Sequence, residues 1–327
     1  MDFELTDEQG FLRQSAREFL ATECNSQVVR RLETSATGHS PELWKKMAEL
    51  GWTGIWLPES FGGAGWGLLG TAVLFEELGR AAFDCPLFAS FMGSQAILLG
   101  GSEKQQESLL PAVCKGEMIL SLAWAEPRVV SDPRYVELSA KRKGRDFRLS
   151  GTKLCVPYAL VADRVVVAAR TRGKAGDEAG LSLFLVDRQS PGLEISELRT
   201  IAPDKQYRLE FEDVRVSAED MIGGLHEGYA VLRAGIDHGA ALQCAEMVGG
   251  AERGLEVTAA YTKQREQFGR PLGTFQAVQH RLADMYTDVQ GARWTAYQAI
   301  SRMDSGKPVA RELAIARSFT SEAAQRV

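Results

Sequence analysis

The chain has 327 residues, 45% of them hydrophobic and 25% charged, which is the balance of a globular protein large enough for two or three domains. Its formal net charge of −5 argues against a nucleic-acid-binding protein, and the nearest approach to a basic block, Lys141–Arg145, predicts a solvated hairpin end. No apolar stretch approaches the length of a membrane span, and the N-terminus is acidic and amphipathic, so we expect a cytoplasmic protein without a signal peptide or membrane insertion.

The five cysteines are odd in number and widely spaced, and no C-x-x-C motif occurs. This pattern predicts reduced thiols and no metal site, rather than a disulfide framework. The cysteines are Cys24, Cys85, Cys114, Cys155 and Cys244.

Residues 1–118 predict an all-α N-terminal domain. Capping boxes at Thr6–Gln9 and at Ser102–Gln105 each precede a helical apolar pattern. Ser40-Pro41 opens a helix that Gly51 closes, and Thr71–Ala82 reads as a compact apolar helix.

Residues 119–222 predict a middle β domain of sandwich or barrel type, because short apolar runs alternate there with turn residues. The candidate strands are Ile119–Ala125, Tyr135–Ala140, Asp146–Leu149, Arg164–Ala169, Leu181–Val186, Leu193–Leu198 and Arg208–Val216.

Residues 223–327 return to the helical period, with helices expected over Gly228–Lys263, Thr274–Met303 and from Pro308 onward. The predicted fold class is therefore α+β, with helices, then strands, then helices. The last ten residues look like the middle of a helix, so either the protein is naturally short or a C-terminal tail is missing.

The segment Tyr261–Met285 carries Arg265, Gln267, Phe268 and Gln276, which suit a large anionic aromatic ligand. A guanidinium grips a pyrophosphate through its planar donors, Phe offers a flat face, and Gln offers amide contacts. The alternative is an ordinary helix–turn–helix with a Gly-Arg-Pro stop.

This segment resembles the C-terminal signature of the acyl-CoA dehydrogenase family, and the likeness extends over residues 1–327. The resemblance implies a flavoenzyme that removes two hydrogens from an acyl-CoA thioester, passes a hydride to FAD and reduces an electron-transfer flavoprotein. It also implies a C-terminal bundle that builds tetramers, in which Arg265, Gln267, Phe268 and Gln276 contact the FAD of a neighbouring subunit.

A second family element cradles the flavin, and it resembles Trp124–Asp132 here. Glu126 and Ser131 are kept, whereas Ala125 replaces a hydroxyl and Val130 replaces a glycine. The resemblance makes Glu126 and Ser131 cofactor-binding positions in a weakened pocket.

A third element resembles Gly151–Ala159, where the family has a tryptophan and a threonine against the flavin. Cys155 stands at the tryptophan position and forfeits stacking, and Pro157 stands at the threonine position without a hydroxyl or an N–H. We expect Cys155 and Pro157 to line the chain's own, damaged flavin site.

The catalytic residue stays unknown at this level. Family members place the glutamate base either at the position of Gly239 or in a tail that would lie beyond Val327, and Ala240 replaces a substrate-side arginine.

The sequence therefore predicts an acyl-CoA dehydrogenase subunit with little or no catalysis of its own, completing the FAD site of a paralogous partner in an α2β2 assembly. Some family members acting on steroid side-chain or other bulky CoA thioesters are built in this way. The alternatives are a self-sufficient homotetramer with its base in a missing tail, and a non-redox scaffold that binds an acyl-CoA or a partner.

Overall fold

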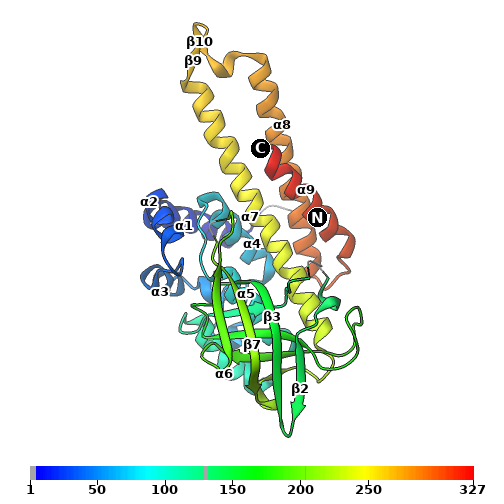
Figure 1. The fold of residues 1–327 in the computed structure, drawn as a ribbon. Helices are drawn as coiled ribbons and strands as arrows, with labels where there is room; N and C mark the ends of the chain where they lie inside the picture. The colour runs from blue at the N-terminus through cyan, green and yellow to red at the C-terminus, as the bar shows by residue number, and fades with distance from the viewer. Residues whose placement is uncertain (1–4, 129–131, 203) are drawn as a thin grey trace. The chain divides into compact units, whose positions relative to one another are not determined.

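The computed structural model describes residues 5–128, 132–202 and 204–327 (Figure 1). Contacts group the chain into two compact units that are discontinuous in sequence. The helical unit contains Met1–Val29, Trp66–Asp84 and Ala240–Val327, and the sheet unit contains Arg30–Gly65 and Cys85–Gly239. The boundaries expected at residues 118 and 222 stay a prediction.

One mixed sheet forms the centre of the sheet unit. Its strands are β1 (Leu120–Ala123), β2 (Ser139–Lys143), β3 (Asp146–Pro157), β4 (Arg164–Arg170), β5 (Leu181–Asp187), β6 (Leu193–Leu198), β7 (Gln206–Val216) and β8 (Met221–Ile222). They are ordered β6-β7-β3-β2-β4-β5-β8, with β1 pairing in parallel to β4.

This confirms the α+β class and the middle β domain, and it corrects two details. A closed barrel, one of the two expected forms, is wrong, because within the described residues β6 and β8 are unpaired ends of this sheet. The strand expected over Tyr135–Ala140 is misplaced, because Pro133–Tyr135 forms a 3-10 turn and the strand begins at Ser139. Proline at the start of that turn lacks the N–H that a strand ladder needs.

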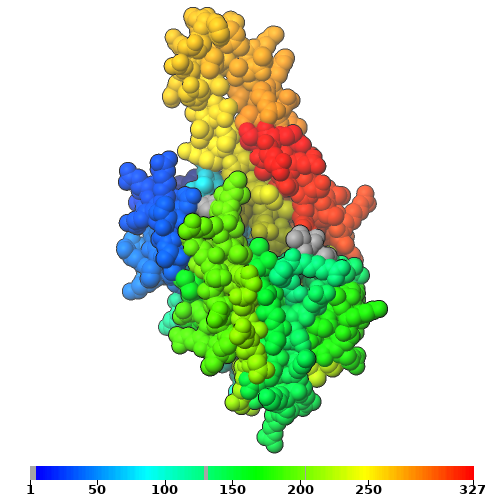
Figure 2. Space-filling view, viewed as in Figure 1, coloured from blue at the N-terminus to red at the C-terminus, as the bar shows by residue number. Residues whose placement is uncertain are grey.

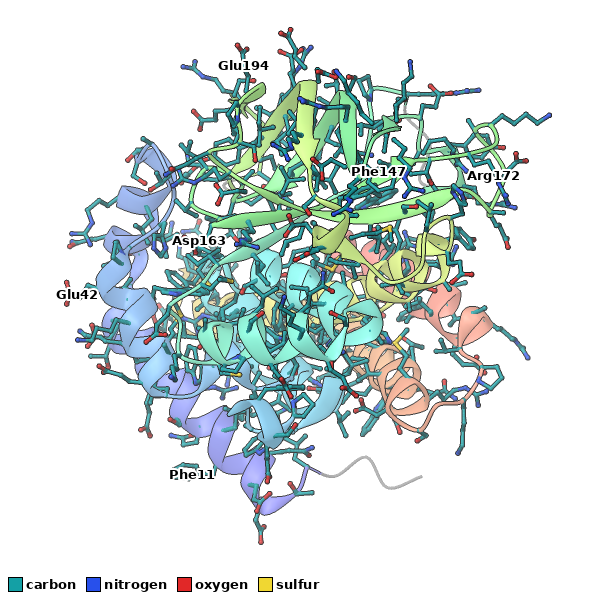
Figure 3. The ribbon with its side chains drawn as sticks, turned by 90° about the horizontal axis from the view of Figure 1, so that it is seen from below. Phe11, Glu42, Phe147, Asp163, Arg172 and Glu194 are labelled. Carbon is teal, nitrogen blue, oxygen red and sulfur yellow. The ribbon has the colours of Figure 1, made fainter. Side chains whose placement is uncertain are left out.

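The sheet unit also contains α3 (Pro41–Glu49), α5 (Leu87–Gly100) and α6 (Glu103–Cys114), and α2 (Ser26–Thr34) has residues in both units. Helix α5 packs closely on β1, since a Cβ on Gly93 would lie 2.6 Å from Leu120 Cβ. Within the sheet, the buried Phe147 ring lies 5.0 Å from that of Phe184, whereas Arg172 and Glu194 point outward (Figure 3).

The helical unit consists of α1 (Asp7–Glu23), α4 (Gly67–Ala81), the part of α7 (Gly228–Gln264) from Ala240, α8 (Gln276–Asp304) and α9 (Ala310–Arg326). The capping boxes predicted at Thr6–Gln9 and at Ser102–Gln105 of the sheet unit are both confirmed. None of the helices in the described residues combines the length and the apolar character needed to cross a bilayer.

Helix α4 buries two adjacent carboxylates in the helical unit. Glu76 and Glu77 each expose only 1% of their side chains. Glu76 accepts a hydrogen bond of 2.8 Å from Tyr297 Oη and pairs with Arg293 at 3.1 Å and Arg13 at 3.4 Å. The carboxylate thereby joins α4 to α1 and to α8.

Glu77 forms a two-pronged pair with Arg17 of α1, at 2.9 and 2.6 Å. Arg80, one turn along α4, forms a second two-pronged pair with Glu256 of α7, at 2.6 and 2.5 Å. Planar pairing of this kind adds geometric specificity to the charge attraction. Helices α1, α7 and α8 are thus each tied to α4.

Glycines bring α4 and α7 into backbone contact. A Cβ on Gly249 would lie 1.7 Å from the Glu76 carbonyl oxygen, and one on Gly79 would lie 1.9 Å from that of Glu246. Because no larger residue fits at either position, the two helices meet at a fixed register.

Glu76→Gln should lower the free energy of unfolding by about 3–5 kcal/mol, because it removes a buried counter-charge of Arg13 and Arg293. The matched control is Glu322→Gln, since the Glu322 side chain is 68% exposed and pairs with Arg326 within one turn of α9. That exposed pair should contribute less than about 1 kcal/mol. Chemical denaturation measures both changes, and equal losses would contradict a special role for Glu76.

Candidate functional site

The segment between α7 and α8 forms a β-hairpin at the end of the two helices (Figure 1). Strand β9 (Glu266–Gln267) pairs with β10 (Arg270–Pro271), and Phe268 and Gly269 form the two-residue turn. Their φ angles are 56° and 78°, as a type I′ turn requires. We call residues 265–276 the arm. The sequence predicted a turn here but missed the hairpin, because Phe-Gly is not a usual type I′ pair.

The tip of the arm presents a strained aromatic residue to solvent. Phe268 is 89% exposed, although a bulky residue at positive φ is an outlier in proteins. Backbone strain of this kind costs about 1–3 kcal/mol and concentrates at binding sites. Its ring meets that of Phe275 edge-on at 6.1 Å, and the Arg270 guanidinium lies 4.2 Å from the Phe275 ring centre.

Arg265, Gln267 and Gln276 lie with Phe268 on this exposed arm. The Arg265 backbone is fixed, because its N–H bonds to Tyr261 and its carbonyl accepts from Leu272. Within the described residues, the Arg265 guanidinium makes no hydrogen bond or ion pair, so its fork of donors remains available. The arm therefore presents an unpaired guanidinium and an exposed aromatic ring to solvent.

The site residues predicted in the sheet unit are engaged differently. Glu126 Oε1 lies 2.7 Å from the fully buried Lys153 Nζ and 2.9 Å from the Leu138 N–H, and Oε2 accepts from the Glu137 N–H at 2.8 Å. Lys153 also donates to the Trp124 carbonyl. The Glu126 carboxylate therefore holds the chain after β1 against β3, a role that sequence reasoning missed.

Cys155 and Pro157 lie near the end of β3. A register shift between Lys153 and Val156 places Cys155 in a bulge, at a φ of 52°, with an exposed side chain. The Pro157 carbonyl accepts a hydrogen bond of 2.6 Å from Ser121 Oγ. Neither residue offers a strong donor, and the predicted positions Ser131 and Val130 lie outside the described residues.

Lys153 gives the sheet unit a measurable pH dependence. Burial lowers its pKa from 10.5 to about 8, against the opposing attraction of Glu126. Between these values the unfolded chain binds more protons than the folded chain, so the free energy of unfolding rises with pH, by at most about 1.4 kcal/mol per pH unit.

We expect Lys153→Met to remove this rise. We expect chemical denaturation at pH 7.5, 8.5 and 9.5 to show that the free energy of unfolding of the native chain increases with pH relative to that of the Lys153→Met variant. A difference independent of pH would show that Lys153 does not titrate in this window.

Gly239 of α7 faces α5. A Cβ on Gly239 would lie 2.3 Å from Met92 Sδ and 3.4 Å from Phe88 Cζ. The Met92 side chain thus occupies the space into which a larger residue at position 239 would project. A side chain at position 239 would therefore require Met92 to move, and Met92 itself gave no signal in the sequence.

Gly235 provides a matched control on the same face of α7, because nothing lies within 4 Å of a Cβ built there. Gly235→Ala should stabilise the chain by about 0.5–1 kcal/mol through helix propensity. Gly239→Ala should instead be less stable than Gly235→Ala by about 1–3 kcal/mol, because Met92 must move. Equal stabilities, measured by chemical denaturation, would show that Met92 yields at no cost.

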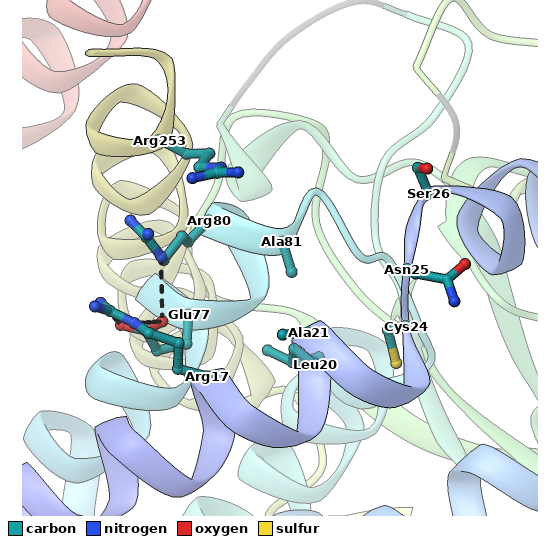
Figure 4. A pocket seen from close by; sticks show the side chains of 10 residues that line it. All are labelled: Arg17, Leu20, Ala21, Cys24, Asn25, Ser26, Glu77, Arg80, Ala81 and Arg253. Atoms are coloured by element: carbon teal, nitrogen blue, oxygen red, sulfur yellow. Dashed lines mark hydrogen bonds and ion pairs between the residues drawn. The ribbon is translucent and has the colours of Figure 1, made fainter. Parts of the chain in front are cut away.

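A cavity of about 290 Å³ in the helical unit is lined by three arginines, Arg17, Arg80 and Arg253 (Figure 4). Each of them is paired with a carboxylate, Arg17 with Glu77 and the other two with Glu256. The cavity is thus close to electrical balance, and its arginines serve the packing of the helices.

Comparison with known families matches three consecutive parts of the chain. Residues 6–117 match the acyl-CoA dehydrogenase N-terminal domain, residues 121–214 the middle domain and residues 226–327 the C-terminal domain.

Individual proteins are similar over nearly the whole chain. A probable acyl-CoA dehydrogenase, YngJ of Bacillus subtilis (strain 168), is 31% identical over 100% of this chain and 87% of its own. The ChsE4-ChsE5 complex from Mycobacterium tuberculosis contains a chain that is 31% identical, with a TM-score of 0.89 over 100% of this chain and 85% of that one. A Tcur3481-Tcur3483 steroid ACAD variant is 34% identical, with a TM-score of 0.87 over 98% and 84%.

Proposed function

Because this chain belongs to the acyl-CoA dehydrogenase family of FAD-dependent oxidoreductases, we propose that it completes the FAD site of a paralogous partner subunit in a hetero-oligomer of the α2β2 type. In this proposal the chain contributes its arm to flavin binding, and the partner contributes the base and most of the substrate site.

The exposed arm is the observation that carries the proposal. Arg265 would grip the FAD pyrophosphate, Phe268 would offer its face to a ring of the cofactor, and Gln267 and Gln276 would make amide contacts. All four side chains are exposed, and the hairpin that carries them ends in a turn whose strain has no evident benefit to this chain alone.

The chain's own sheet unit fits FAD less well. The Glu126 carboxylate is already satisfied by Lys153 and two backbone N–H groups, so it has little capacity left for a ligand. Pro157 has no N–H, and Cys155 cannot stack on a flavin. The described residues therefore fit the cofactor at the arm, and we assign Cys155 and Pro157 no binding role.

When bound, FAD takes up a hydride from the β-carbon of an acyl-CoA thioester. The accompanying α-proton needs a carboxylate base, and Gly239 cannot supply one. This chain would thus bind and orient the cofactor, the partner would hold the proton, and an electron-transfer flavoprotein would receive the electrons.

The names of two similar proteins support the presence of a partner subunit. One is a chain of the ChsE4-ChsE5 complex, and the other is the Tcur3481-Tcur3483 steroid ACAD. A CoA thioester with a bulky acyl group, such as a steroid side chain, is the substrate class that this likeness favours.

Arg265→Ala tests the proposal in a complex formed by co-expression with a candidate paralogous subunit. Loss of a charge-assisted contact of roughly 1.5–3 kcal/mol should weaken FAD binding by one to two orders of magnitude, while subunit assembly is retained. Arg311→Ala removes an equally charged, exposed side chain on α9 and should leave FAD affinity unchanged.

The outcomes separate the alternatives. FAD bound only by the co-expressed complex supports the proposal, whereas the lone chain holding stoichiometric FAD and being reduced by a CoA thioester identifies a self-sufficient dehydrogenase. A colourless, stable homo-oligomer identifies a scaffold. If Arg265→Ala retains FAD but abolishes assembly, the arm is structural.

A further inference from the structure

Three cations lie directly opposite one another on adjacent strands of the sheet unit. Lys141 of β2 pairs in register with Arg148 of β3, and Arg148 pairs in register with Arg215 of β7. Residues opposite each other in antiparallel strands share a face, so the three side chains form one row. Like charges placed in this way destabilise a sheet unless carboxylates offset them.

The surrounding hairpin end adds further positive charge. Residues 141–148 and 213–215 contain six cations but only two carboxylates, whereas the whole chain has a net charge of −5. Asp146 bonds to Arg215 at 2.6 Å, and Asp213 lies 3.4 Å from Arg148. Within the described part of the chain, the remaining four cations have no carboxylate partner; they are Lys141, Arg142, Lys143 and Arg145.

Most of this positive charge lies at the exposed turn end of the β2–β3 hairpin. Gly144, with a φ of 67°, stands first in the two-residue turn between β2 and β3, which matches a type II′ turn. The β2–β3 hairpin projects from the rest of the sheet (Figures 1 and 2), and residues 141–145 are all exposed. The solvated hairpin end predicted from the sequence is confirmed, and its Lys141 belongs to the row of three cations.

The residue types beside the positive charge indicate which class of anionic partner this surface fits. Single-stranded nucleic acids stack on exposed aromatic side chains, and membrane surfaces are bound through apolar residues beside the basic ones. The only aromatic residue of the hairpin end is Phe147, which is buried. A surface with charge but without apolar contacts fits the acidic face of a protein.

Spacing indicates the form of that face. Adjacent strands lie about 4.8 Å apart, so the row of three cations spans roughly 10 Å. On a helix, carboxylates at positions i, i+4 and i+7 span about 10.5 Å along one face. We propose that the row Lys141–Arg148–Arg215 docks an acidic helix of a partner protein, through contacts that do not involve the flavin arm.

A binding experiment with the full chain tests this proposal. The probe is a fluorescent helical peptide with glutamates at i, i+4 and i+7 on one face, compared with a peptide of the same composition in which the glutamates are dispersed. Fluorescence anisotropy should show tighter binding of the patterned peptide at 25 mM salt, and a marked loss of that binding at 250 mM salt.

Lys141→Gln combined with Lys143→Gln should weaken binding of the patterned peptide by about three- to tenfold, as expected for two exposed ion pairs. These lysines have no ion-pair partner in the described chain, so folding should be unchanged. Lys104→Gln combined with Lys307→Gln makes the same change in net charge at exposed sites elsewhere and should change binding less than twofold.

Equal binding of the two peptides, or equal effects of the two double variants, would overturn the proposal. Tighter binding of a single-stranded oligonucleotide or of anionic lipid vesicles than of the patterned peptide would also overturn it, because the surface would then recognise polyanions of another class. None of these results bears on FAD retention by Arg265→Ala, so the two proposals fail separately.

Discussion

The burial of Glu76 and Glu77 side by side on α4 is the constraint on which the helical unit depends. Two carboxylates removed from water require several cations and hydrogen-bond donors in fixed positions. Those groups come from α1 and α8, and the carboxylates of α7 pair in turn with Arg293 and Arg80, so the helices cannot shift along one another without leaving a buried charge unpaired. The glycine contacts between α4 and α7 act in the same direction, because backbone contact tolerates no sliding.

This anchoring bears directly on the arm. Glu256 and Arg293 hold α7 and α8 within the charge network, and α7 continues for about 13 Å from Glu256 to Arg265. The hairpin is consequently displayed by two helices that are fixed at their base. A strained residue such as Phe268 can persist there, since the flanking strand pair and helices determine the backbone around it. A binding element built on rigid helices loses less entropy when its ligand arrives.

The sheet unit contains two kinds of charged site, one buried and one exposed. Lys153 and Glu126 are buried, and every polar atom described for the pair is directed to a partner, which suits a structural tie. Four cations of the β2–β3 hairpin are exposed and have no carboxylate partner in the described residues, which suits recognition; they are Lys141, Arg142, Lys143 and Arg145. In composition, both sets of residues are simply charged. Their different burial is what distinguishes the structural pair from the exposed cations.

The sequence by itself determined the elements whose signals are local. Capping boxes, Pro and Gly punctuation and apolar periodicity placed α1, α3, α6 and the long C-terminal helices, and alternation placed most strands, because such patterns depend on neighbouring residues. The likeness of the arm segment to a known family indicated the cofactor. Only the tertiary structure decided that Glu126 is committed to Lys153, that Met92 fills the space beside Gly239, and that Lys141, Arg148 and Arg215 form one row. Each of these depends on residues far apart in the chain, whose register and burial follow from how strands pair and helices pack.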